Sequence, residues 1–276
     1  MNRDNAVHFG ESLLILPAVA LGVLAMIHGG VSPALWGQQM AAWALLALTV
    51  RPLRRVAGRI SDGVWSAALL LLLAASLFGQ AVAGARRWVN LMVFHANAAQ
   101  LVLPALIVLQ CRGKWSYPVL LGAATVLSLQ PDLSQLAALG AAVLVTAPSR
   151  SEKKLWKAGA LVLLGLLVVF CLRTPIVIEQ VAYCEGILGM LGDISWLLAA
   201  AGGVSLGLIP TFFGYRFCRQ GDKQALALAA YYAVSMLFAL SGAYPVPFMG
   251  FGLSPIAGYY LVCICTDMTG QNKAIG

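Results

Sequence analysis

The chain contains little charge for its size. Charged residues make up 10% of its 276 residues, only 10 residues are acidic, and hydrophobic residues make up 61%. A soluble domain carries about 25% charged residues. This scarcity argues against a soluble globular domain and predicts an all-α, polytopic helical membrane protein that forms a single domain over residues 1–276.

Residue patterns that bind metals are also scarce. The histidines His8, His28 and His95 are scattered, and the six cysteines contain no Cys-x-x-Cys pair. No metal site and no certain cofactor are therefore predicted, and a divalent cation that accompanies a substrate is left open. Cys171 and Cys184 fall on the same expected side of the membrane, where a disulfide and two free thiols are both compatible with the sequence.

Long apolar runs dominate what is present. A spanning helix needs roughly 20 apolar residues, and fewer where neighbouring helices support a half helix. The first run follows a polar head without a clear cleavage site and is interpreted as an uncleaved helix. Ten spans are predicted, over residues 12–29, 33–50, 63–83, 95–111, 116–129, 134–148, 157–173, 186–214, 224–242 and 247–266.

The basic residues indicate the orientation of these spans. With the N-terminus inside, only Arg86, Arg87 and Arg173 of the 18 Lys and Arg residues fall in outer segments. Inner loops of membrane proteins are enriched in Lys and Arg. About ten transmembrane helices with both termini cytoplasmic are therefore predicted. Because the net charge of +8 is spread over separate inner loops and tails, membrane lipids rather than nucleic acid are the expected surroundings.

Two outer arginines and a tryptophan, Arg86, Arg87 and Trp88, follow the third span. An arginine pair can bind a phosphate through several hydrogen bonds, and Trp suits the membrane interface. Binding of a substrate phosphate and a plain anchor to lipid headgroups both fit these residues.

Two further outer turns interrupt apolar runs with proline. Pro131 disfavours helix at Gln130, and Asp132 can cap the next half helix. A plain helical hairpin turn fits the same residues. The segment from Tyr244 to Phe248, which includes Pro247, predicts an outer turn and an irregular start to the last helix, for which a simple kink is the alternative.

The segment from Arg173 to Asp193 holds three of the ten acidic residues, Glu179, Glu185 and Asp193. Ionisable residues close to membrane depth favour a function. Glu185 is therefore the candidate reacting carboxylate, and a carboxylate that only caps the eighth helix is the alternative.

The order of three motifs resembles the SEDS family (shape, elongation, division and sporulation), which includes FtsW, RodA and SpoVE. The motifs are Gly-Ala-Arg-Arg-Trp at 84–88, Gln-Pro-Asp-Leu at 130–133 and Pro-Val-Pro-Phe at 245–248. The resemblance runs from about residue 63 to the end and includes the ten-span topology. It identifies the chain as similar to a shortened, divergent member.

This resemblance implies a multi-pass enzyme of the bacterial cytoplasmic membrane that polymerises lipid II, or a related undecaprenyl-linked precursor, at the outer face. It implies a role in cell division, elongation or shape control, beside a class B penicillin-binding protein transpeptidase. Glu185 resembles the family's catalytic position and Asp193 the first residue of a following acidic pair. Arg86, Arg87, Trp88, Gln130, Asp132 and Pro247 are the further expected substrate-binding residues.

The motifs also depart from the family pattern. Where the family has Pro-Ser-Glu followed by Lys, the chain has 96–98 as Ala-Asn-Ala and Leu101. The family's Gly-Thr after Gln-Pro-Asp-Leu is replaced by Ser134 and Gln135. Three hypotheses follow: a peptidoglycan glycosyltransferase with Glu185 as base, a catalytically impaired relative that binds the precursor or a wall-synthesis partner, and a transporter of lipid-linked precursors.

Overall fold

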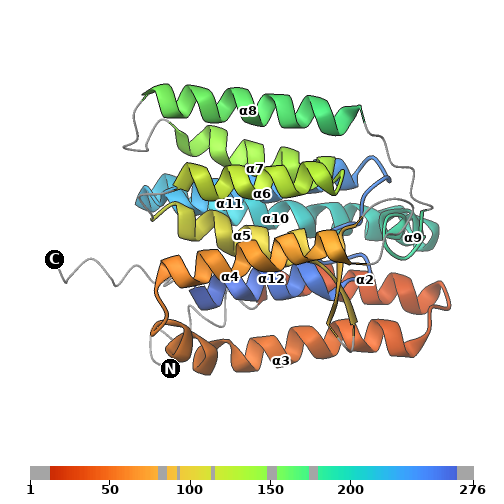
Figure 1. Cartoon of the computed structure of the whole chain (residues 1–276). Helices are drawn as coiled ribbons and strands as arrows, with labels where there is room; N and C mark the ends of the chain where they lie inside the picture. The colour runs from red at the N-terminus through yellow and green to blue at the C-terminus, as the bar shows by residue number, and fades with distance from the viewer. Residues whose placement is uncertain are drawn as a thin grey trace.

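The computed structural model describes residues 13–79, 86–91, 94–112, 116–147, 154–173 and 180–265. Within these ranges it contains eleven α-helices, one 3-10 turn (η1, Ser76–Phe78) and one β-hairpin. The helices are α2 (Leu16–His28), α3 (Pro33–Ala57), α4 (Asp62–Ala75), α5 (Ala98–Gln110), α6 (Ser116–Leu129), α7 (Leu133–Thr146), α8 (Lys154–Leu172), α9 (Ile187–Ile194), α10 (Trp196–Gln220), α11 (Lys223–Ala239) and α12 (Leu253–Cys265). Figure 1 shows the long helices side by side along one axis.

A helix lies in each of the ten ranges expected from the sequence. The eighth range holds two helices, because Ser195 is extended and its side chain accepts a hydrogen bond from the Leu197 N–H, which starts α10. The last helix starts at Leu253, because the Pro-Val-Pro-Phe segment before it is not helical. The termini, expected to be cytoplasmic, lie outside the described residues.

The β-hairpin before α5 was not predicted. Strand β1 (Trp88–Leu91) pairs antiparallel with β2 (Phe94–Asn97), and Trp88 lies opposite Asn97. The Asn97 side chain then accepts a hydrogen bond from the Gln100 N–H at 3.2 Å and starts α5. The fourth helix therefore begins three residues later than expected. Figure 1 places the hairpin and α9 at the same end of the bundle.

Helix α5 forms the centre of the bundle. Every residue of α5 except Leu101 is buried, and the helix packs against α4, α6, α11 and α12. A helix that is apolar on all sides must be enclosed by other elements. Gly258 of α12 permits a close approach to α5, because a Cβ atom there would collide with the Gln100 carbonyl oxygen.

The turns expected on the inner side meet at the end of the bundle away from the hairpin. Arg54 of α3 donates a hydrogen bond to the Cys263 carbonyl at 2.9 Å, and Arg112 donates one to the Cys265 carbonyl at 3.2 Å. Arg112 also lies 3.9 Å from the Asp62 carboxylate. Two arginines thus stabilise the last carbonyls of α12.

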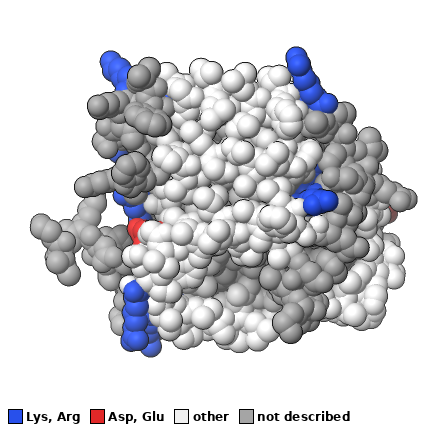
Figure 2. All heavy atoms as spheres, in the orientation of Figure 1, with Lys and Arg blue, Asp and Glu red and all other residues white. Residues whose placement is uncertain are grey.

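Large hydrophobic side chains cover the outside of the bundle. Leu48, Leu71 and Val204 are 76%, 70% and 64% exposed, on three different helices. Figure 2 shows a broad band without charged side chains between two ends that carry Lys and Arg. By length and composition, one described helix, Trp196–Gln220, can cross a membrane, and seven shorter apolar helices accompany it. The ten-span topology stays a prediction.

Candidate functional site

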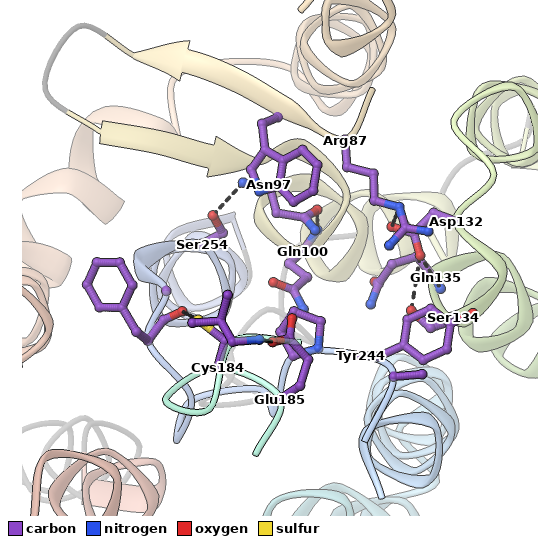
Figure 3. Close-up of a pocket in the computed structure, with 16 residues that line it drawn as sticks. Arg87, Asn97, Gln100, Asp132, Ser134, Gln135, Cys184, Glu185, Tyr244 and Ser254 are labelled. Carbon is purple, nitrogen blue, oxygen red and sulfur yellow. Dashed lines mark hydrogen bonds and ion pairs between the residues drawn. The ribbon is translucent and has the colours of Figure 1, made fainter. Parts of the chain in front are cut away.

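A cavity of about 550 Å³ lies at the end of the bundle that carries the hairpin. Its volume falls within the range typical of small-molecule sites. Four separate chain segments supply its polar side chains, which Figure 3 shows converging from different elements. The lining residues are Arg87, Trp88, Asn97, Gln100, Asp132, Ser134, Gln135, Val181, Cys184, Glu185, Ala243, Tyr244, Pro245, Phe251, Gly252 and Ser254.

A buried ion pair forms one side of the cavity. The Arg87 Nε atom lies 3.7 Å from the Asp132 Oδ2 atom, and the two residues are only 6% and 1% exposed. Arg87 also donates a hydrogen bond from Nη2 to the Pro131 carbonyl at 2.6 Å. A buried charge is costly unless an opposite charge and hydrogen bonds accompany it, and this geometry supplies both to Arg87.

Asp132 also starts α7, as predicted. Its Oδ1 atom accepts hydrogen bonds from the Gln135 N–H at 3.3 Å and from the Ser134 hydroxyl at 3.0 Å. The carboxylate therefore caps a helix with one oxygen and faces Arg87 with the other. This double role fixes the position of the guanidinium group.

Tyr244 contacts the same arginine from the segment after α11. The Arg87 Cζ atom lies 5.9 Å from the centroid of the Tyr244 ring. Such a cation–π contact is favourable and strengthens with desolvation. Burial raises the pKa of the Tyr244 hydroxyl, and the Asp132 charge adds to the shift, so the phenol stays protonated.

Glu185 lies in a tight turn immediately before α9. Its Oε2 atom accepts a hydrogen bond from the Val181 N–H at 2.9 Å, and its own N–H donates to the Val181 carbonyl at 3.0 Å. The segment before α12 holds this turn in place. Val246 N–H donates to the Cys184 carbonyl at 3.1 Å, and Phe251 N–H donates to the Tyr183 carbonyl at 2.8 Å.

Cys184 beside this carboxylate is a thiol. Burial raises its pKa to about 12, and the Glu185 charge adds to the shift. The Sγ atom lies 3.4 Å from the Phe251 carbonyl, to which it donates a weak hydrogen bond. Cys171 and Cys184 do not form the disulfide that the sequence left open.

The structure brings four of the expected site residues together and leaves four outside the cavity. Arg87, Trp88, Asp132 and Glu185 line it, whereas Arg86, Gln130, Asp193 and Pro247 do not. Glu179 lies outside the described residues.

The four residues outside the cavity are either exposed at the surface or buried elsewhere in the bundle. Arg86 is exposed and donates to the Leu77 carbonyl at 2.9 Å, so the two arginines do not form a joint phosphate clamp in this structure. Gln130 is buried and donates to the Ser76 hydroxyl and the Leu73 carbonyl. Asp193 is exposed at the end of α9, and Pro247 is buried.

Several neutral polar residues of the cavity were not among the predicted site residues. Asn97, Gln100 and Ser254 line one part of it, and the Asn97 N–H donates to the Ser254 hydroxyl at 2.8 Å. Gln135 accepts a hydrogen bond from the Tyr231 hydroxyl at 2.6 Å. The available signal was an isolated polar side chain within an apolar run, since such a side chain must meet a partner or a cavity.

No group of three or more His, Cys, Asp or Glu side chains that could hold a metal ion occurs in the described part of the chain. The donors present therefore do not form a metal site on their own, and no chemical step is assigned to a metal ion. The cavity combines one guanidinium group, two carboxylates and a set of neutral hydrogen-bonding groups. Such a set can bind an anion at Arg87 and accept a proton at Glu185.

Comparison with solved structures identifies the fold as SEDS-like. The rod shape determining protein RodA of Thermus thermophilus aligns with a TM-score of 0.64 and 19% identity, over 93% of this chain and 95% of that chain. A mutant of the same protein aligns with the same TM-score and 20% identity, over 93% and 96%. At this identity the similarity establishes the fold.

A chain from a peptidoglycan synthase complex, solved to show how polymerization and crosslinking are coordinated, is also similar. It aligns with a TM-score of 0.57 and 21% identity, over 93% of this chain and 96% of that chain. No protein-family model and no curated protein sequence matches the chain.

Proposed function

We propose that this protein is a multi-pass protein of the bacterial cytoplasmic membrane that polymerises lipid II, or a related undecaprenyl-linked precursor, at the outer face. One observation carries the proposal. Arg87, Asp132 and Glu185, from three turns expected outside the membrane, line one cavity at one end of the bundle. The SEDS-like fold supports the same reaction class.

The surface of the bundle supports the membrane location. Soluble monomers rarely expose contiguous apolar patches larger than a few hundred Å². Here exposed Leu and Val side chains on α3, α4 and α10 face outward, and the face in Figure 2 has no charge across its middle. Lipid is the surrounding that makes such a surface stable. We therefore propose the ten-span topology, with the cavity outside.

In the proposed reaction, an acceptor sugar hydroxyl attacks the anomeric carbon of a second precursor. The bond from that carbon to the pyrophosphate oxygen breaks, and the lipid pyrophosphate leaves. Glu185 accepts the proton of the attacking hydroxyl, and Arg87 stabilises the negative charge on the leaving group. Trp88 and Tyr244 border the same cavity.

A protein partner of the class B penicillin-binding type belongs to the proposal. One similar structure is part of a peptidoglycan synthase complex that couples polymerization and crosslinking. In this proposal the protein would supply glycan strands, and the transpeptidase would crosslink them during division, elongation or shape control.

The test uses purified protein in proteoliposomes with lipid II, and glycan strands are separated on gels. Glu185→Gln removes the base while it keeps the side-chain shape, so we expect a rate loss of about 100-fold to 10,000-fold. Asp62→Asn, a carboxylate at the opposite end of the bundle, is the matched control and should keep the wild-type rate. Full activity in Glu185→Gln would refute the role of Glu185.

A second candidate is a catalytically silent relative that binds the precursor. The existing contacts of the two charged residues favour it. The Arg87 guanidinium is occupied by Asp132 and Pro131, and Glu185 accepts a hydrogen bond from its own turn. This candidate predicts that wild-type protein binds lipid II without forming polymer and that Glu185→Gln binds equally well. Polymer formation by the wild type would exclude it.

A further inference from the structure

The Gln100 side chain lines the cavity and has no hydrogen-bond partner among the described residues. Gln100 is 8% exposed, lines the cavity and lies at the centre of Figure 3, between Arg87 and Glu185. Within the part of the chain that the structure describes, no hydrogen bond engages its side chain. Because the polar side chains of buried residues normally meet a partner, the group that bonds this carboxamide lies in the cavity, as water or as a ligand.

The backbone of Gln100 is held on two sides. Its N–H donates to the Asn97 side chain at 3.2 Å. Its carbonyl lies against α12, where only glycine fits at position 258. The side chain therefore has a fixed origin, and its position is set by the packing of α5 rather than by a loop.

A second carboxamide lines the same cavity. Gln135 is 3% exposed, and its Oε1 atom accepts a hydrogen bond from the Tyr231 hydroxyl at 2.6 Å. The tyrosine thus leaves the NH₂ group of Gln135 as its free donor. Gln100 offers both an acceptor and a donor.

These two groups fit an uncharged ligand group. An anion would leave the Gln100 carbonyl oxygen without a donor, and a cation would leave both NH₂ groups without an acceptor. A secondary amide carries its N–H and its C=O on opposite edges, so it can donate to Gln100 and accept from Gln135. We propose that Gln100 is a specificity-determining residue that binds a secondary amide of the substrate, with Gln135 as its counterpart.

The inference rests on the proposed function for the kind of ligand, a lipid-linked sugar. A secondary amide on such a molecule is either the acetamido group of the sugar or an amide of an attached peptide. Both sources offer the same chemistry.

The experiment measures binding rather than turnover. Calorimetry follows a short-prenyl lipid II analogue, a second analogue with a hydroxyl in place of each acetamido group, and a third without the peptide. We expect wild-type protein to bind the first about tenfold more tightly than one of the other two, the effect of one net hydrogen bond. Weaker binding of the second analogue assigns the amide to the sugar, and weaker binding of the third assigns it to the peptide.

Gln100→Leu should reduce this preference below twofold. Gln110→Leu, the same change on the same helix, is the control and should keep the preference, because Gln110 bonds Ser66 away from the cavity at 2.7 Å. Gln100→Asn replaces the Leu variant if that variant does not fold, and its shortened amide should also lower the preference.

An undiminished preference in folded Gln100 variants, or no preference in the wild type, would overturn the inference. Wild-type protein that shows the preference but forms no polymer would instead refute the proposed polymerase activity and leave the inference standing.

Discussion

The Arg87–Asp132 pair makes the sharpest prediction about stability. At 3.7 Å and an effective dielectric constant of about 20, the attraction between the two charges is about 4 kcal/mol. Removing one partner of a buried pair leaves the other charge uncompensated, which costs about 3–5 kcal/mol. We therefore expect Asp132→Asn and Arg87→Met each to lower the free energy of unfolding by about 3 kcal/mol.

The double variant tests whether the stability losses of the two single variants are coupled. Asp132→Asn keeps an oxygen for the α7 cap, and Arg87→Met keeps the apolar stem, so the double variant leaves no buried charge. We expect it to be about 2 kcal/mol more stable than the sum of the single losses predicts. Equilibrium unfolding in mixed micelles, followed by circular dichroism, measures all four proteins.

A matched pair at the other end of the bundle provides the control. Arg112 and Asp62 lie 3.9 Å apart, but their side chains are 31% and 48% exposed. The same cycle there should yield under about 1 kcal/mol of coupling. Strictly additive losses for Arg87 and Asp132 would show that the pair does not stabilise the fold through its charges.

Two further predictions concern the turn that carries Glu185. Gly250→Ala should lower both the stability and the activity of the protein, because the new Cβ atom would collide with the Cys184 carbonyl oxygen. Gly207→Ala is the control and should change neither, because no atom lies near its Cβ position. Unfolding curves and polymer assays compare the two variants. The raised pKa of Cys184, about 12 against the ordinary 9.0, implies about a thousandfold less thiolate near neutral pH. Maleimide labelling, read by mass spectrometry, should therefore leave Cys184 unmodified while the exposed Cys218 reacts, and equal rates would contradict the raised pKa of Cys184.

The helices could be predicted because local features determine them. Apolar runs of helical length are visible without any tertiary information, and strong breakers separate them. Pro131 ends α6, and Asp132 caps α7, as their residue types require. The hairpin could not be predicted, because two four-residue strands within an apolar run resemble the start of a buried helix.

The candidate site was only partly predictable. Arg87 and Glu185 stand out as charges near apolar runs, but the sequence cannot tell which of two adjacent arginines faces inward. In an extended segment neighbouring side chains point in opposite directions, and pairing to β2 decides the outcome. The Arg87 carbonyl accepts a hydrogen bond from the Ala98 N–H at 3.0 Å, which continues the hairpin pairing.

The neutral part of the cavity depends on contacts between distant residues. Asn97 and Ser254 are 157 positions apart and meet only because α5 packs against α12. The spacing of residues along the chain does not predict such a contact. An isolated Gln100 in an apolar run indicates a buried polar residue, but the cavity that it lines becomes visible only in the packed bundle.

The hydrogen bonds that hold the Glu185 turn have a consequence for biosynthesis. The ribosome synthesises the Glu185 turn before Val246 and Phe251, whose N–H groups hold it and which follow more than 60 residues later in the chain. While the ribosome is still translating that interval, the carboxylate cannot occupy its final position. A nascent chain truncated before residue 246 therefore cannot form the complete site, and the cavity can form only after the segment before the last helix has been synthesised.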